Sequence, residues 1–384
     1  MSNWRYIATR LNGNATETVL DWDLPISGAV IRDDLSGPGS IRGIIEPETA
    51  RLRVGGRPLL EPWSTAIYAE ADGVIRGGGI LVELAEEGPA LTVDCVGFSG
   101  YAQGMPYVDE WSKTNIDPMD AVREIWRHLQ SKPGGNLGLT LDPTKSLAKI
   151  GNVKKSSSST SVSTNGKTGK TTTTTKDTST IEPYVLAWYK THNLGEEFVR
   201  LARETPFDYR VSHRWEGEKI LHHMQLGYPE IKNRKTGLRF VVGENLFEVP
   251  ELSYDGEQYA DEVVTLGTGE GRKMIRGNAK RESPRLRRVA VVEDSSLTTA
   301  ARANTFAQGE LNARAGGVDI SLVLQVEHPH APIGSVSVGD DILIQTAAGW
   351  TDALDMWCRV LAVVLEPDRG FARLTVTRTE KARI

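Results

Sequence analysis

The residues of this chain that could bind a nucleotide lie in one glycine-rich segment. Gly267, Gly269 and Gly271 follow a strand-like run and give the spacing G-x-G-x-G. The dinucleotide-binding fingerprint needs a glycine or alanine where Arg272 stands, and an opening helix where this sequence is basic, β-like and soon reaches Pro284. The segment also lacks the Gly-Lys-Ser/Thr ending of a P-loop. We therefore predict a tight turn between two strands and no nucleotide cofactor.

The histidines give little indication of a metal-binding site. His222 and His223 are adjacent in a strand pattern, so their side chains point to opposite faces of the strand and cannot share an ion. His328-Pro-His330 could chelate an ion weakly, but no second ligand cluster or cysteine pair supports it. The sequence therefore predicts no metal site.

A hydrolase would need a nucleophile motif, a zinc-binding helix or a pair of carboxylates across a cleft. The sequence has no Gly-x-Ser-x-Gly and no His-Glu-x-x-His motif. Asp21 and Asp23 share one strand face, as many exposed acids do, and sequence alone does not pick out glycosidase carboxylates. Tryptophans that could stack on sugars are isolated and are more often core or interface anchors; they are Trp4, Trp22, Trp63, Trp111 and Trp350. We predict that the chain is not an enzyme, with no catalytic residues and no cofactor.

Charge is distributed in two adjacent blocks of opposite sign. Residues 244–262 hold seven acidic residues and no Lys or Arg, whereas residues 271–288 hold eight basic residues and one acid. Complementary patches of this kind steer and orient association. One interpretation is that the blocks meet across subunits, and the other is that both are solvated surfaces. The first interpretation predicts an interface that contains Glu251, Asp255, Glu257, Arg272, Lys273, Arg285, Arg287 and Arg288.

The overall composition is that of a globular protein with two or three domains. The 384 residues are 39% hydrophobic and 25% charged, and the net charge of −5 argues against nucleic-acid binding through bulk electrostatics. No run approaches the roughly 20 apolar residues of a membrane span, and the start of the chain has no apolar signal region. We expect a chain that is made and folded in a cytoplasm. Cys95 and Cys358 lie in apolar, strand-like segments, which favours buried free thiols over a disulfide.

Short strands dominate both ends of the chain. Residues 1–108 contain several strands with glycine turns, and Asp72-Gly73 is a strong hairpin signal between two of them. In the last third we expect one helix, residues 297–313, inserted in a ring of short antiparallel strands, which is typical of a small barrel. These strands are predicted at residues 263–266, 286–293, 319–326, 341–345, 357–365 and 372–378.

The segment between these ends predicts a mixed α/β domain. Asp117-Pro118 supplies a cap and a helix-start proline. Apolar residues then recur on one helical face; they are Met119, Val122, Ile125, Trp126 and Leu129. Further helices fit Pro183–Tyr189 and Leu194–Arg203, and strands resume at Phe207–Arg214, Lys219–Gln225 and Leu238–Val242.

One insert stands out within the middle domain. Residues 152–180 are almost purely Ser, Thr, Gly and Lys. Such a segment cannot bury enough apolar surface to offset the entropy of ordering, so we expect a mobile loop or an extended arm. An arm that orders against a neighbouring subunit is the alternative. The predicted fold class is thus mainly β with an α+β middle: two small tube-type β-barrel domains, residues 1–108 and 251–384, flank a mixed domain, residues 109–250.

The order of several segments resembles the minor tail proteins of long-tailed phages of actinobacteria, which are similar to the baseplate hub, or tail-associated, protein family. Each motif is a glycine turn or an apolar strand, and their order is the more specific signal. The Ser/Thr-rich insert departs from the family pattern. The matching segments are residues 24–28, 35–38, 56–68, 76–81, 94–101, 117–138, 243–246, 267–271 and 338–341.

This resemblance implies a structural role in a virion. It implies a homotrimer in which two related barrels per chain form a pseudo-sixfold ring that caps the tail tube and offers threefold symmetry to the tip. The implied partners are the distal tail protein, the tape-measure protein and other minor tail or fibre proteins, with viral DNA passing through the bore without sequence-specific binding. Because the chain stops at Ile384, soon after its last predicted strand, we expect a hub without a fused hydrolase or fibre domain.

Two alternatives to the hub stay open at the level of sequence. One is a tail-tip enzyme that acts on cell-wall glycans or peptides, which would need a cleft with perturbed carboxylates. The other is a host-receptor module that binds a glycan, for which exposed Trp or Tyr on one face would be the signature.

Overall fold

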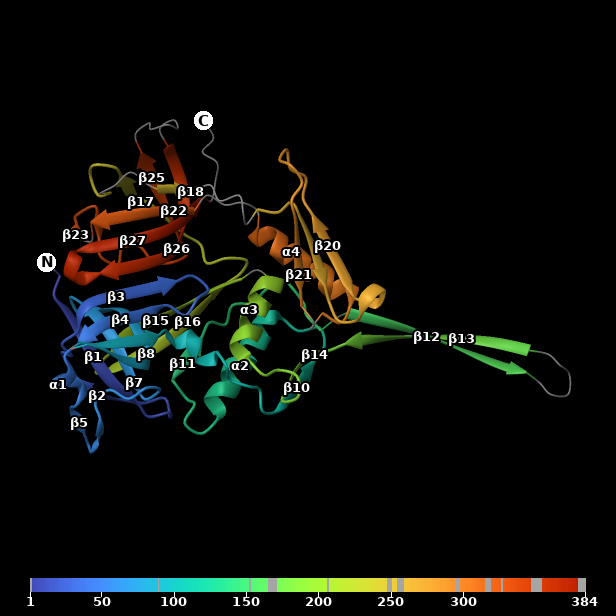
Figure 1. Cartoon of the computed structure of the whole chain (residues 1–384), viewed down its shortest axis with the longest axis horizontal. Coiled ribbons are helices and arrows are strands. Elements are labelled where there is room, and N and C mark those ends of the chain that lie inside the picture. The colour runs from blue at the N-terminus through green and yellow to red at the C-terminus, as the bar shows by residue number, and fades with distance from the viewer. Residues whose placement is uncertain are drawn as a thin grey trace.

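The protein consists of a strand-rich body with two projections, as the computed structural model shows (Figure 1). The structure describes residues 2–378 except 89, 152, 165–170, 206, 247–250, 254–258, 295–296, 315–318, 326 and 347–353. The mainly β fold class predicted from the sequence is confirmed, because a 13-stranded mixed sheet runs through the body.

The N-terminal part of this sheet is an antiparallel series in the order β3-β4-β9-β8-β7-β1-β2. The Asp72-Gly73 hairpin is confirmed: both residues have positive φ, 51° and 80°, as the tight turn between β7 and β8 requires. The strands are β1 (Trp4–Leu11), β2 (Glu17–Asp21), β3 (Ser27–Asp34), β4 (Ser40–Ile45), β7 (Thr65–Ala71), β8 (Val74–Glu87) and β9 (Ala90–Val96). The short elements α1 (Pro47–Ala50), β5 (Arg53–Val54) and β6 (Arg57–Pro58) lie between β4 and β7.

The C-terminal strands continue the same sheet. They are β17 (Asn233–Val241), β18 (Glu251–Ser253), β22 (Asp319–Gln325), β25 (Asp340–Thr346), β26 (Leu354–Glu366) and β27 (Phe371–Arg378), with β23 (Glu327–His328), β24 (Ala331–Pro332) and η3 (Pro367–Arg369) beside them. Strand β26 joins the two parts, because Val363 pairs with Asp33 and Leu365 with Ile31 of β3. We call this strand pair the seam. The division into two barrel domains stays a prediction, since their strands share one sheet here.

A middle unit packs two helices over short sheets. Its core holds the fully buried Trp126 of α2 and the buried Phe198 of α3. The predicted first helix is confirmed as α2 (Pro118–Ser131), and its cap Asp117 accepts the Met119 N–H at 2.9 Å. The other elements are η1 (Phe98–Ala102), β10 (Glu110–Lys113), β11 (Leu139–Leu141), β14 (Tyr184–Ala187), α3 (Leu194–Glu204), β15 (Asp208–Glu216) and β16 (Lys219–Gly227).

One helix prediction in this unit is wrong. The segment Pro183–Tyr189 contains strand β14 instead, which pairs antiparallel with β10. Four apolar or aromatic residues in a row fit either a short helix or a strand, and pairing with a partner that lies far back in the chain decides between them.

The Ser/Thr-rich insert forms a long two-stranded hairpin. Strand β12 (Val153–Thr164) pairs antiparallel with β13 (Thr171–Glu182), and the hairpin extends away from the body (Figure 1). The sequence predicts a loop or arm without a core of its own, and the backbone has the extended arm form.

The second projection is a small sheet covered by one helix, which we call the blade. It contains β19 (Glu262–Leu266), η2 (Gly271–Lys273), β20 (Arg276–Lys280), β21 (Val289–Glu293) and α4 (Ala300–Ala313), and β19 lies between β20 and β21. The glycine-rich segment is the turn after β19, as predicted. The predicted inserted helix is also present, beginning at Ala300 rather than Leu297, because Thr299 takes the cap position.

Candidate functional sites

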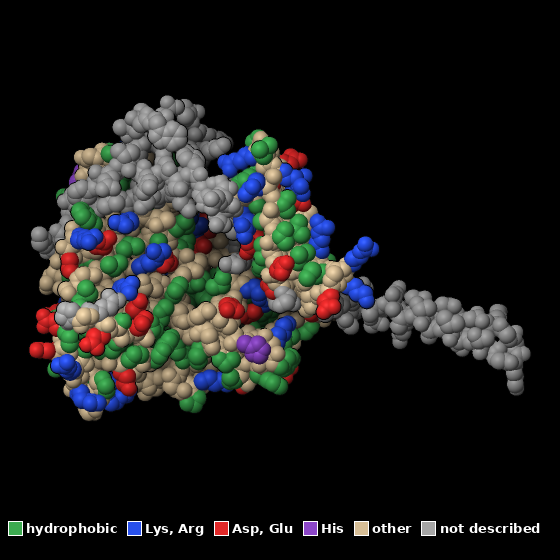
Figure 2. Space-filling model, viewed as in Figure 1, with side chains coloured by type: hydrophobic (Ala, Val, Ile, Leu, Met, Phe, Trp, Pro, Cys, Tyr) green, Lys and Arg blue, Asp and Glu red, His purple; other side chains and the backbone are tan. Residues whose placement is uncertain are grey.

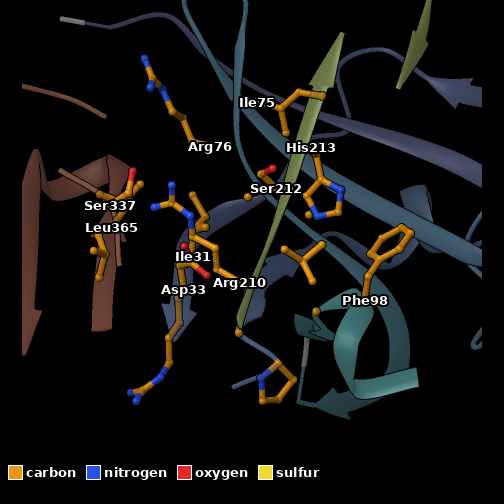
Figure 3. Close-up of a pocket in the computed structure, with 18 of the residues that line it drawn as sticks. Ile31, Asp33, Ile75, Arg76, Phe98, Arg210, Ser212, His213, Ser337 and Leu365 are labelled. Carbon is orange, nitrogen blue, oxygen red and sulfur yellow. The ribbon is translucent and has the colours of Figure 1, made fainter. Parts of the chain in front are cut away.

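A cavity of about 220 Å³ lies against the seam. Its lining comes from β3, β8, β15 and the segment before β25, so it touches both parts of the large sheet. Figure 3 shows Asp33 of β3 close to Arg210 of β15, with His213 and Phe98 farther along the lining. The cavity therefore combines a carboxyl group with cationic and aromatic side chains at the joint between the two parts.

The carboxyl group of Asp33 is the titratable centre of this cavity. Burial raises its pKa to about 7, although the positive charge of Arg210 partly opposes this shift. Arg210 is held in place because its Nε donates to Gln225 Oε1 at 2.8 Å and its Nη1 donates to the Val338 carbonyl at 2.9 Å. A group with this pKa changes charge near neutral pH, at the point where the two parts of the sheet are joined.

A buried polar network lies next to the cavity and links β2 to the β15–β16 hairpin. His222 Nε2 lies 2.8 Å from Glu17 Oε1, and His222 Nδ1 lies 2.8 Å from His213 Nδ1. Tyr68 donates its hydroxyl proton to the same Glu17 oxygen at 2.7 Å. Burial and the neighbouring His222 hold the pKa of His213 well below its usual range. Each of these polar side chains has a partner within the network, so the network stabilises the contact between β2 and the β15–β16 hairpin.

The two adjacent histidines point to different partners, as the strand pattern predicts. His222 belongs to the buried network, whereas His223 Nε2 lies 2.9 Å from Asp142 Oδ1. Cys95 and Cys358 are both buried and are not joined in a disulfide, which confirms that prediction as well. Asp21 accepts the backbone N–H of Asp23 at 2.9 Å, an ordinary loop contact.

The tryptophans singled out in the sequence lie in different surroundings. Trp22 stacks on Trp215 with ring centroids 5.8 Å apart, and Trp111 packs edge-on against Tyr184 in the middle unit. Trp63 is exposed on the loop before β7, and Trp350 lies outside the described residues.

Charged side chains of the blade and of the middle unit meet where α4 lies beside α3. On α3, Arg200 bonds to Glu197 and Glu204, and Arg302 of α4 lies 3.9 Å from Glu204. Arg200, Glu204 and Arg302 border a second cavity of about 400 Å³ between α3 and α4, which Lys190 also lines. Burial lowers the pKa of Lys190, and the two arginines nearby lower it further. The cavity between the blade and the middle unit is therefore lined largely by charged side chains.

The predicted interface residues are only partly brought together within one chain. Arg287 of the basic block bonds to Glu262 of the acidic block, with Nη2 to Oε2 at 2.6 Å. Arg288 donates its backbone N–H to Asp261 at 2.7 Å. The guanidinium of Arg285 lies over the Tyr259 ring, 4.7 Å from its centroid. Part of the charge complementarity that the sequence shows is therefore satisfied inside the chain.

The other members of the two blocks lie apart from these pairs. Arg272 and Lys273 are exposed on η2. The backbone of Glu251 is in β18, whereas Asp255 and Glu257 lie outside the described residues. Their predicted contact across subunits stays a hypothesis.

The outer face of the blade combines these charges with exposed apolar side chains. The strand register places Val264 beside Val291 and Asn278, on the face opposite α4. Val289 and Val291 are exposed there on β21, and Arg276 and Lys280 are exposed on β20, at the other edge of the sheet. Figure 2 shows hydrophobic side chains along the middle of the blade with Lys and Arg side chains at its margins. An apolar strip rimmed by charge is typical of a protein-contact surface.

The fold formed by this sheet, middle unit and blade is similar to that of solved tail proteins, two of them from prophages. The chain is similar to the 43 kDa tail protein of prophage MuSo2 from Shewanella oneidensis, with a TM-score of 0.55, 10% identity and 98% of each chain covered. A tail protein from Neisseria meningitidis gives a TM-score of 0.53 at 12% identity, covering 98% of this chain and 97% of that one.

A third solved structure has the same fold. The prophage tail protein gp18 from Listeria monocytogenes has a TM-score of 0.51 at 10% identity, with 98% of this chain and 95% of that chain covered. The sequence matches no family model and no curated protein. Among the described residues, no helix has the length and apolar character needed to cross a membrane.

Proposed function

We propose that this chain is a structural protein of a phage tail, located in the virion at the tail tip. The observation that carries the proposal is the similarity in fold, over nearly the whole length of both chains, to solved tail proteins from three different bacteria, two of them prophage proteins. A match that includes the seam, the middle unit and the blade together is more specific than a match to one common domain.

The finer proposal is a trimeric baseplate hub that caps the tail tube. The seam places two strand-rich parts of one chain side by side, so three copies around an axis present six such parts. Such a ring would match a sixfold tube above and a threefold tip below. Its partners would be the distal tail protein, the tape-measure protein and other minor tail or fibre proteins.

The blade is the surface that we assign to contact between subunits. Its outer face carries exposed valines on β21 and exposed basic side chains on β20, and Arg272 and Lys273 extend this positive charge onto η2. The acidic block lies directly before the blade in the sequence, and its members would face the basic margin of a neighbouring copy.

The mass and shape of the purified full-length protein test the proposal. We expect light scattering to give three times the 42.1 kDa chain mass at high concentration, and negative-stain images to show threefold rings with a central hole. A protein that stays at the mass of one chain over a wide concentration range would contradict self-assembly into a hub. Added distal tail protein would then show whether a trimer forms only on the tube.

A further inference from the structure

Three metal-ligating side chains that lie far apart in the sequence meet on the surface of the C-terminal part of the sheet. One ligand atom from each of Glu244, His328 and His330 lies within 4.8 Å of the other two. His330 Nδ1 is in hydrogen-bond contact with Glu244 Oε1, and His328 Nδ1 accepts the backbone N–H of His330 at 3.2 Å. We propose that these residues form a binding site for a divalent transition-metal ion, with zinc as the best match.

Both turns that carry the ligands are anchored in the protein core. The turn with Glu244 is fixed by the buried Asn245, whose Oδ1 accepts the Val241 N–H and whose Nδ2 donates to the Arg239 carbonyl, both at 2.8 Å. The turn with the histidines joins β23 to β24, where the buried Ala331 pairs with His328. Ala331 and the Leu246 that follows the first turn pack in the same hydrophobic core. The backbone thus sets the separation of the ligands before any ion binds.

The distances suit an ion of the size of zinc. Bonds of about 2.1 Å from zinc to nitrogen or oxygen place tetrahedral ligand atoms about 3.4 Å apart. The present separations are all within 4.8 Å, and Glu244 and His330 are 43% and 69% exposed, so their side chains have room to rotate towards an ion. The ion would replace the hydrogen bond between His330 and Glu244, and His330 would coordinate it through the imidazole nitrogen that carries no proton.

The donor set decides which ions fit. Two imidazoles and one carboxylate are a borderline N/O set that favours zinc, nickel or copper, whereas calcium and magnesium prefer oxygen ligands throughout. Three protein ligands leave the fourth position of a tetrahedral ion open towards solvent. A water molecule, or a side chain of a bound protein, would complete the coordination. The inference does not depend on the proposed hub function.

Isothermal titration of the metal-free, full-length protein with zinc chloride tests this site. We expect one ion per chain, and at least tenfold weaker binding for His330→Ala and for Glu244→Gln. His192→Ala is the matched control, because it also removes one exposed imidazole, on the loop before α3, and it should bind zinc as the wild type does. Thermal melting of each variant shows that it is folded.

Cobalt substitution gives a second readout that reports geometry. A cobalt ion held by this set should produce visible absorption bands of tetrahedral intensity, and His330→Ala should lose them while His192→Ala keeps them. Absence of saturable zinc binding to the wild type would overturn the proposal. Equal affinity of wild type and His330→Ala would overturn it too, since the ion would then be bound elsewhere.

Discussion

The middle unit and the blade are both helix-on-sheet structures, but they differ in how completely they bury their apolar side chains. In the middle unit, α2 and α3 enclose Trp126 and Phe198 in a core of many large side chains. In the blade, α4 places Ala303 and Ala307 against small residues of the sheet, and the outer face of that sheet stays exposed. The middle unit therefore buries more large apolar side chains than the blade does. We expect the stability of the blade to depend more on its contacts with the rest of the protein.

The largest expected effect is in the core of the middle unit. Trp126 is fully buried, so Trp126→Ala removes a large apolar surface and leaves a cavity, which should lower the free energy of unfolding by about 3–5 kcal/mol. Urea denaturation measures this value. Val199→Ala, on the exposed side of α3, is the control and should change stability by less than about 0.5 kcal/mol. A loss below about 1 kcal/mol for Trp126→Ala would contradict the view that this core dominates stability.

The helix caps of the two regions give a smaller, paired test. Asp117 is buried and accepts the Met119 N–H together with the Ser146 N–H and hydroxyl, so Asp117→Ala should cost about 2 kcal/mol. Thr299 caps α4 with one longer bond of 3.4 Å, and Thr299→Ala should cost less than about 1 kcal/mol. Chemical denaturation of both variants under identical conditions measures the difference. Equal losses would show that the cap of the blade helix matters as much as that of the core helix.

Charge reversal on the blade should affect assembly more than folding. The variant Arg272→Glu/Lys273→Glu replaces two exposed bases on η2, so we expect a change in unfolding free energy within about 0.5 kcal/mol but about tenfold weaker self-association. The effect should grow at low salt, because screening then weakens. Arg51→Glu/Arg53→Glu makes the same change in net charge far from the blade and should leave association unchanged. Sedimentation at two salt concentrations measures both, and equal weakening by the two variants would exclude a specific role for the blade.

The seam lies outside both regions, and a substitution there is expected to change the free energy of unfolding least. Because burial raises the pKa of Asp33 to about 7, the folded protein binds more protons than the unfolded chain between about pH 4 and 7. Its contribution to stability is therefore lost as pH rises through 7. Relative to Asp33→Asn, the wild type should lose about 1 kcal/mol between pH 5 and 7.5, a value reduced because the cavity is open to solvent. Denaturation curves at each pH measure the free energy of unfolding of both proteins. The same pH dependence in both would show that burial does not raise the pKa of Asp33.

Local patterns in the sequence predict the local structure well. Asp72-Gly73 gives the hairpin because both residues tolerate positive φ, and Asp117-Pro118 with the apolar face after it gives α2. The composition of residues 152–180 predicts a loop or an extended arm, and the pairing of β12 with β13 is an addition that composition does not show. Together these local signals are sufficient to predict the fold class.

Contacts between distant segments account for what the sequence does not reveal. The short run in Pro183–Tyr189 becomes β14 because β10 pairs with it, and nothing within the run itself distinguishes strand from helix. The cluster of Glu244, His328 and His330 is not visible in the sequence for the same reason. His328 and His330 are close in the sequence, but Glu244 joins them only after β17 and β24 come together in the fold.

The seam also has a consequence for how the chain is made on the ribosome. Asp368 accepts the backbone N–H of Gly28, which lies 340 residues earlier, and β3 must wait for β26 before its second edge is paired. During most of synthesis, β3 is therefore an open edge strand, and such edges pair readily with the wrong chain. Closing a loop of this length also delays the final step of folding. A nascent chain of this protein is thus expected to need protection by chaperones until its last strands leave the ribosome.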